Sequence, residues 1–280
     1  MSTMLTFAAA HGADRIVALG VLGLRALHYV AEGRPAAGPP VEGLHVTAVG
    51  AAERPGWHQA TGLYGFLRLP PGPRRLLVTD PARRFQAAAL NLVVPDRSAV
   101  RRQLEQGVET PEVNPRPLLG TVALHLAPGQ PLRPGLTAVQ GVVRDAEGRP
   151  VALARLALET LLEGALRRHH AWSEADGSYL LPLPGERPDS IGGNPPWRAE
   201  RVLSVHAPRP SLRAALAADW LAALPAERDA IDPDAAGSPW ERRSFTLRAA
   251  DGTTRAGAGG ADPTLEILGG RQTRWDIELA

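Results

Sequence analysis

Short runs of alternating apolar and polar residues recur along most of the chain, and glycine, proline and aspartate separate one run from the next. Alternation places successive side chains on opposite faces of a strand, so that one face can be buried. Leu22, Leu24 and Ala26, for example, share one face of a first strand. Between residues 20 and 95 the pattern predicts about six or seven short strands, which is typical of a β-sandwich.

The alternation stops between residues 96 and 118, where charged residues are followed by Pro111, Pro115 and Pro117. Prolines interrupt helices and strands, so we predict a short helix and then an extended, proline-rich connector. Alternation resumes at residue 119, and it predicts a second sandwich over residues 119–280.

One segment of the second half has the periodicity of a helix. Leu212, Leu216, Trp220 and Leu224 recur at every fourth position, and alanine fills much of the rest. This spacing places the apolar side chains on one face of an amphipathic helix. We therefore predict a helical insert over residues 211–228.

A turn-and-hairpin pattern occurs twice along the chain. Residues 32–35 and 147–150 both read Glu-Gly-Arg-Pro, and in each case a strand follows and then a Gly-x-Tyr hairpin that ends at Tyr64 or Tyr179. Glycine supplies the backbone angles of the turn, and each tyrosine can place its ring in the core of a sandwich. The repeat indicates two sandwiches of similar construction.

This pattern resembles the carboxypeptidase-regulatory-like, or transthyretin-like, group of β-sandwich domains. The resemblance covers roughly residues 20–95 and 136–207, and residues 240–280 close the second sandwich. It implies an all-β fold of two tandem antiparallel Greek-key β-sandwiches with about seven strands each. Modules of this group usually lack catalysis and are attached to enzymes, surface proteins and phage-like particles. The insert at 211–228 and the long connector depart from the family pattern.

The composition excludes several kinds of chemistry. The chain has no cysteine, which excludes disulfides, thiolate zinc sites, iron–sulfur clusters and cysteine nucleophiles. Its 31 basic residues are all arginine and are balanced by 29 acidic residues, which gives a formal net charge of +2 at pH 7. The pI of about 9.6 reflects the high pKa of arginine rather than a strongly positive chain, so no nucleic-acid partner is predicted.

No pattern of a known catalytic or cofactor site occurs in the sequence. The doublet His169–His170 could hold a metal together with Glu174 or Asp176, but neighbours on one strand point to opposite faces. We therefore interpret both histidines as solvated strand residues. The two tyrosines and the His-x-His pair that hold iron in intradiol dioxygenases are not matched either.

Three aspartates follow the predicted helix. Asp229, Asp232 and Asp234 lack the glycine and the distal glutamate of a calcium-binding loop, and Pro233 interrupts them. We therefore predict that the three aspartates belong to a polar loop at the end of the helix and do not bind calcium. The sequence therefore predicts no catalytic, cofactor-binding or metal-binding residue.

Residues 1–19 form an N-terminal arm outside the first predicted sandwich. The first ten residues carry no positive charge, and the apolar run 16–24 is about nine residues long, against about 20 for a membrane-spanning helix. We therefore predict cytoplasmic synthesis without a signal peptide, no membrane insertion, and incorporation in a particle. A place in the cell envelope or outside the cell is the alternative.

These features favour a non-enzymatic structural or adaptor protein. Tandem sandwiches of this kind without a signal peptide are similar to accessory proteins of phage tail-like and contractile injection particles, and this resemblance implies that the chain is an accessory component of such a particle. Its partners would be other protein subunits, among them further copies of this chain. The candidate contact residues are apolar or aromatic: Leu5, Phe7, Trp57, Trp220 and Leu224. Packing of Trp220 and Leu224 on the second sandwich is the competing interpretation of those two side chains.

Two other functions stay open at this point. An envelope or extracellular module that binds carbohydrate or protein predicts an exposed aromatic patch, such as Trp57 with Tyr64. A metal-dependent enzyme of the dioxygenase type predicts bound iron.

Overall fold

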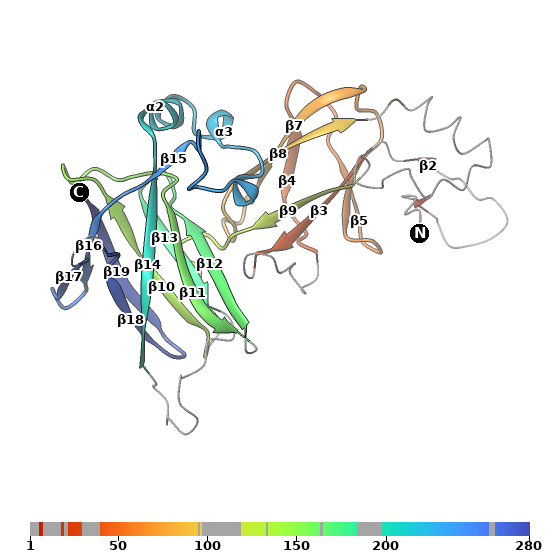
Figure 1. Ribbon diagram of the computed structural model, residues 1–280. Coiled ribbons are helices and arrows are strands. Elements are labelled where there is room, and N and C mark those ends of the chain that lie inside the picture. Colours follow the sequence, from red (N-terminus) through yellow and green to blue (C-terminus); the bar gives the residue numbers. More distant parts are fainter. Residues whose placement is uncertain are drawn as a thin grey trace.

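The computed structural model shows a chain built mostly of strands, which form two bodies that lie side by side with short helices near their junction (Figure 1). The prediction of all-β sandwiches is thereby confirmed. The structure describes residues 6–7, 18–19, 22–29, 40–94, 96, 119–132, 134–162, 165–183, 198–257 and 261–280.

The first body is a sandwich of two sheets. One sheet has the strand order β5 (Gly56–His58), β6 (Leu63–Phe66), β3 (Leu22–His28) and β9 (Leu119–Leu124). The other has the order β4 (His45–Ala48), β7 (Gly72–Thr79) and β8 (Ala88–Val94). Apolar residues of both sheets meet in one core, in which Leu22, Leu24, Phe66 and Leu76 are fully buried.

The second body is a larger sandwich with its own core. One sheet has the order β13 (Ser178–Leu183), β10 (Thr137–Arg144), β19 (Gln272–Leu279), β16 (Phe245–Ala249) and β17 (Thr254–Ala256). The other has the order β12 (Ala165–Trp172), β11 (Arg155–Leu162), β14 (Arg198–Pro208) and β15 (Trp240–Arg242), and β18 (Thr264–Leu268) also pairs with β14. Leu156, Leu181, Val205 and Ile277 belong to the core between these sheets.

The two sandwiches share several strand pairings. β6 pairs antiparallel with β3 as β13 does with β10, and β4 pairs with β7 as β11 does with β14. Each sandwich also contains a parallel pair, because β9 lies beside β3 and β19 lies beside β10. β9 therefore closes the first sandwich in the same way that the C-terminal strand β19 closes the second.

This pairing corrects the predicted domain boundary. The sequence places the start of the second sandwich at residue 119, but residues 119–124 form β9 of the first sandwich. Alternation identifies a strand without identifying its partner, which here is more than 90 residues away in the chain. The connector 96–118 thus links β8 to β9 of one sandwich; apart from Asp96, it lies outside the described residues.

Both repeated tyrosines lie in a sandwich core, as predicted. Tyr64 is 4% exposed, and its hydroxyl donates to the carbonyl of Val41 at 3.0 Å and accepts from the amide of Leu44 at 2.9 Å. Tyr179 is 1% exposed, and its hydroxyl donates to the carbonyl of Trp275 at 2.6 Å. Each tyrosine therefore ties two segments of its sandwich together. The first turn of the repeat, 32–35, lies outside the described residues.

The sandwiches also share a five-residue turn closed by an aspartate and an arginine. In the first, the carboxylate of Asp80 accepts from the amide of Arg84 at 2.8 Å and from its Nε at 2.9 Å. In the second, Asp145 accepts the equivalent bonds from Arg149, both at 2.9 Å. Burial alone would raise the pKa of Asp80, but the bonds from Arg84 outweigh it and hold that pKa below its ordinary value.

The helical insert is present, but it is not one helix. α2 (Pro210–Ala218) ends at Asp219, whose backbone is extended, and the carboxylate of Asp219 then accepts from the amide of Ala222 to begin α3 (Trp220–Ala223). A short 3₁₀ turn, η1 (Arg228–Ala230), follows. The predicted single helix over 211–228 is therefore wrong, because aspartate favours the capping position over the helix interior.

Of the N-terminal arm, the structure describes β1 (Thr6–Phe7) and β2 (Ala18–Leu19), which pair antiparallel with each other. Leu5 lies outside the described residues, and for Phe7 the structure describes its pairing with Ala18. The docking role of both residues stays a prediction. No helix in the described part of the chain is long and apolar enough to cross a membrane.

Candidate functional site

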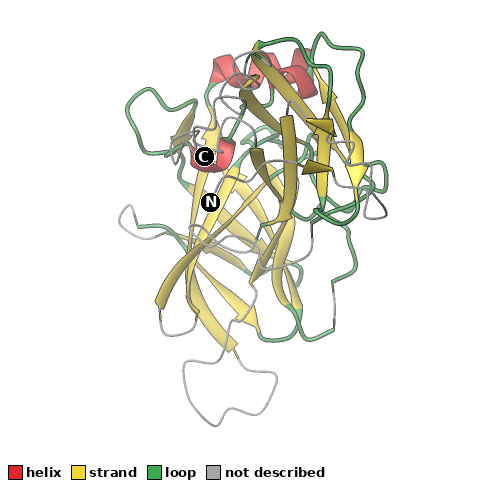
Figure 2. Ribbon diagram, turned by 90° about the vertical axis from the view of Figure 1, so that its right-hand side faces the viewer, coloured by secondary structure: helices red, strands yellow, loops and turns green. Residues whose placement is uncertain are grey.

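The insert lies between the two sandwiches and forms a third apolar cluster with both of them. Figure 2 shows the helical segments in the upper half of the molecule, above much of the strand layers. We call the following set the interdomain cluster: Ala89, Leu153, Trp172, Leu216, Leu224 and Trp240, with Leu77, Ala87, Leu212, Trp220, Ala223 and Ile231 packed against it. The first sandwich, the second sandwich and the insert all contribute to it.

Hydrogen bonds to backbone carbonyls reinforce this interface. The guanidinium of Arg75, on β7, donates to the carbonyls of Ala222 and Leu224. The amide of Glu227 donates to the carbonyl of Ala89, on β8, at 3.0 Å. The side chain of Gln86, in the first sandwich, donates to the carbonyl of Trp172, in the second, at 2.7 Å. The insert is thus bonded to the first sandwich, although its chain belongs to the second.

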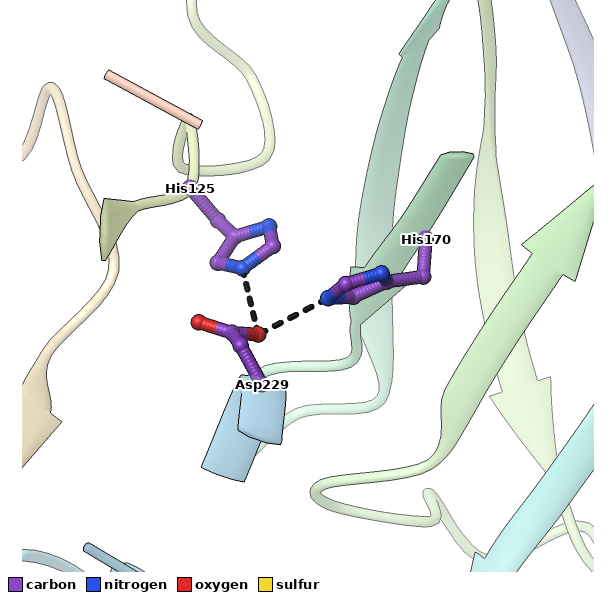
Figure 3. Close-up of side chains that lie close together, drawn as sticks. All are labelled: His125, His170 and Asp229. Atoms are coloured by element: carbon purple, nitrogen blue, oxygen red, sulfur yellow. Dashed lines mark hydrogen bonds and ion pairs between the residues drawn. The ribbon is translucent and has the colours of Figure 1, made fainter. Parts of the chain in front are cut away.

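One carboxylate oxygen joins all three parts of the molecule (Figure 3). Oδ1 of Asp229, on η1, lies 2.8 Å from Nε2 of His125 and 2.8 Å from Nε2 of His170. The indole N–H of Trp172 donates to the same oxygen at 2.8 Å. His125 directly follows β9 of the first sandwich, whereas His170 and Trp172 lie on β12 of the second. We call these four residues, together with Tyr29, the Asp229 cluster.

Local structure fixes each member of the cluster. The segment around His125 pairs with the segment around Phe85, because the amide of Gln86 donates to the carbonyl of His125 at 2.9 Å. His170 is held by the ladder of β12 with β11, opposite Ala157. Asp229 follows Glu227, whose positive φ of 52° turns the chain into η1. The three polar side chains therefore converge from hydrogen-bonded backbone segments.

Tyr29 completes the surroundings of His170. Its hydroxyl lies 2.7 Å from Nδ1 of His170, and its ring stacks on His125 with a centroid distance of 4.2 Å. On another side, the buried guanidinium of Arg228 lies over the ring of Trp172, 5.4 Å from the centroid. His125 and His170 are 3% and 1% exposed, while the side chain of Asp229 is 26% exposed, so one edge of the cluster reaches solvent.

Burial and hydrogen bonds act in opposite directions on the pKa values within the cluster. Burial lowers the pKa of His170 from 6.5 to about 4, although the hydrogen bond to Asp229 opposes the shift. Burial alone would raise the pKa of Asp229, but His125 and His170 outweigh it and hold the pKa well below its ordinary value. At neutral pH the cluster therefore presents an ionised carboxylate and a neutral His170 imidazole.

The histidine doublet points to opposite faces of β12, as predicted, but it is not solvated. His169 is fully buried with its Nε2 2.8 Å from Oγ1 of Thr160, while His170 faces Asp229. The expectation of solvated strand histidines is therefore wrong. Strand alternation places the two rings on opposite faces correctly, but it does not show that other chain segments cover both of those faces.

Neither His125 nor the role of Asp229 is predicted by the sequence pattern. His125 follows an apolar strand, which is a signal of a buried polar position, but its partner is 104 residues away. Of the other two aspartates, Asp234 lies 2.9 Å from Nε2 of His206, and Asp232 accepts from the amide of Asp234 at 3.0 Å. The polar loop predicted for Asp232 and Asp234 is what the structure shows.

The predicted contact residues are used mainly within the chain. Leu224 is 1% exposed and Trp220 packs beside it in the interdomain cluster, rather than on the second sandwich alone. Trp57 packs against the first core and lies on Tyr64 with a ring centroid distance of 4.8 Å. Because Tyr64 is buried, this pair does not form the exposed aromatic patch that the carbohydrate-binding alternative requires.

Comparison with known proteins gives no family for this chain. No protein-family model matches it, and the search of curated proteins found no match. Among solved structures, the major pilin subunit BcpA of Bacillus cereus is 8% identical with a TM-score of 0.23, over 78% of this chain and 41% of that pilin. A variant of the shaft pilin SpaA of Lactobacillus rhamnosus GG is 8% identical with a TM-score of 0.22, over 92% and 97% of the two chains. Scores this low do not bear on function.

Proposed function

We propose that this chain is a structural adaptor in which two β-sandwiches are held as one rigid body, without catalytic activity of its own. The observation that carries the proposal is the interdomain interface, where an insert of the second sandwich is buried against the first and the Asp229 cluster bonds to both. An adaptor positions its partners only if its docking surfaces keep a fixed relative orientation. A buried polar network supplies such orientation, because it is satisfied in one geometry alone.

The docking surfaces in this proposal lie on edge strands. β8 and β12 each end a sheet in the described part of the chain, and they expose Val93 at 63% and Leu166 at 72%. Leu166 and the 55%-exposed Val202 line a groove of about 630 Å³ over β11, β12 and β14. Edge strands offer unpaired backbone groups to a partner, and exposed apolar side chains add contact area.

The class of assembly is a further part of the proposal. Tandem transthyretin-like or carboxypeptidase-regulatory-like sandwiches suit an accessory subunit of a phage tail-like or contractile injection particle, whose partners are other protein subunits. Such a subunit is made in the cytoplasm without a signal peptide and is then incorporated in the particle. A module of the cell envelope is the competing possibility, and it predicts a different cellular fraction.

Sedimentation tests this proposal. Full-length tagged protein, expressed in its native cells, should co-sediment with large particles and recover particle subunits in affinity purification. The double variant Leu166→Glu, Val202→Glu should remain in the light fractions, whereas Val49→Glu, which changes a residue 51% exposed on the first sandwich, should not. Recovery of the wild-type protein as a free species in envelope or medium fractions would refute the particle role.

A further inference from the structure

We propose that His125, His170 and Asp229 bind one divalent transition-metal ion, zinc by preference, and that this ion joins the two sandwiches to the insert. The ligand atoms are Nε2 of each histidine and a carboxylate oxygen of Asp229. All three atoms lie within 4.8 Å of one another. The proposal departs from the expectation of no metal site in this chain, and it rests on the proposed function only in that the ion would stiffen the adaptor.

The distances suit one small ion. Zinc binds imidazole nitrogen and carboxylate oxygen at about 2.0–2.2 Å, so ligands of one ion lie about 3.3–3.6 Å apart in a tetrahedron. The carboxylate oxygen is 2.8 Å from each histidine nitrogen. Each contact between the carboxylate and a histidine would therefore widen by about 0.5–0.8 Å to admit the ion, and the two histidine nitrogens, which lie within 4.8 Å of each other, would move to a similar separation. Three protein ligands leave a fourth position on the partly exposed edge of Asp229 for water or a partner group.

The surroundings of the three ligands are those of a built metal site. Ligating histidines commonly use their second ring nitrogen in a hydrogen bond that fixes the ring, and Nδ1 of His170 lies 2.7 Å from the hydroxyl of Tyr29. Ligating carboxylates are likewise held by hydrogen bonds, and Asp229 accepts from the indole of Trp172. Tyr29 and Trp172 are therefore positioning residues in this proposal.

The donor atoms indicate which cation the site would bind. Imidazole nitrogen suits zinc, iron, copper and nickel, whereas magnesium and calcium prefer oxygen ligands. Two nitrogens and one oxygen, with no thiolate in the chain, select zinc, iron(II) or cobalt(II) rather than magnesium or calcium.

The chain supplies a matched control. His206 and Asp234 form a second histidine–aspartate contact, 2.9 Å long, between β14 and the segment that follows the insert. His206 is 3% exposed, as buried as His125. Only one histidine takes part, so this pair offers two ligand atoms instead of three. His206→Ala should therefore change zinc affinity less than about twofold.

The test is isothermal titration of the full chain with Zn²⁺ after treatment with EDTA, together with elemental analysis of the protein as purified. We expect one ion per chain, and visible absorption of tetrahedral type when Co²⁺ replaces Zn²⁺. His170→Ala and Asp229→Asn should weaken zinc binding at least about 100-fold, and Tyr29→Phe about tenfold. Circular dichroism on each variant shows whether it is folded. Asp229→Asn is the decisive variant, because the amide oxygen of asparagine can still accept the hydrogen bond from the indole of Trp172.

Several results would overturn the metal site. One is that the folded wild-type chain shows no saturable binding of Zn²⁺. Another is that Asp229→Asn binds Zn²⁺ as tightly as the wild-type chain. A third is that His206→Ala loses as much zinc affinity as His170→Ala. Retention of iron that Asp229→Asn abolishes, with no affinity for Zn²⁺, would support the metal site but overturn the preference for zinc. Because no partner protein enters these measurements, a failure of the adaptor role in sedimentation is distinguishable from a failure of the metal site.

Discussion

Truncation of Leu224 tests whether the insert couples the two sandwiches. Leu224 is 1% exposed and belongs to the interdomain cluster rather than to either sandwich core. Leu224→Ala removes three buried carbons, which is about 2.4 kcal/mol of transfer free energy at about 0.8 kcal/mol each. The cavity that remains raises the expected loss to about 3–4 kcal/mol. Since this free energy is lost from the interface between the sandwiches, we expect the two sandwiches to unfold in separate transitions.

Calorimetry gives the number of transitions, and hydrogen exchange measured by mass spectrometry assigns each of them to β3 or to β10. The matched control is Leu156→Ala, because Leu156 is 0% exposed in the second core. The control should lower stability by a similar amount while the sandwiches still unfold together. A single unfolding transition of Leu224→Ala, in which β3 and β10 lose protection together, would show that the insert does not couple the two sandwiches.

Three further predictions concern the features that the sandwiches share. Asp80→Asn should lower the free energy of unfolding by about 2 kcal/mol at pH 7, because its buried carboxylate accepts charge-assisted bonds from an arginine. The folded pKa of Asp80 lies below its ordinary value of 3.8, so this stabilisation is present above pH 3.8 and is lost as the pH falls through the folded pKa. In urea unfolding, the difference in stability between the wild-type chain and Asp80→Asn should therefore be smaller near pH 3 than at pH 7. Tyr179→Phe should cost about 1–2 kcal/mol by calorimetry, since it leaves a buried carbonyl without its donor, and an unchanged Tm would contradict this. Gly177→Ala should destabilise more than Gly148→Ala in the same assay, because both have positive φ but only at Gly177 would a Cβ lie 2.5 Å from a backbone oxygen; equal effects would count against it.

The strands and the repeat could be predicted from the sequence, because both depend on local patterns. Tyr64 and Tyr179 are examples, since a Gly-x-Tyr hairpin predicts a buried ring without knowledge of its partner. The place of β9 could not be predicted, because its alternation suits an edge position in either sandwich. The parallel pairing of β9 with β3 depends on which of the two sandwiches has an open sheet edge, and the local sequence pattern of β9 does not contain that information.

The candidate site could not be predicted from the sequence for the same reason. His125, His170 and Asp229 come from three segments that are up to 104 residues apart, and no spacing rule joins them. The periodicity of the insert correctly predicts an apolar face, but the sequence does not show that this face covers two sandwiches. The sequence therefore makes Leu224 and Trp220 candidates for contact with a partner, whereas in the structure they pack in the interdomain cluster.

The central claim is that the two sandwiches form one rigid body, and a distance distribution between them tests it most directly. The chain has no cysteine, so Val49→Cys and Val202→Cys can be spin-labelled in one molecule without other labelled sites. These side chains are 51% and 55% exposed, on the first and second sandwich. Pulsed electron spin resonance should give a single narrow distribution that broadens in Leu224→Ala. A broad distribution in the otherwise unaltered protein would contradict the claim.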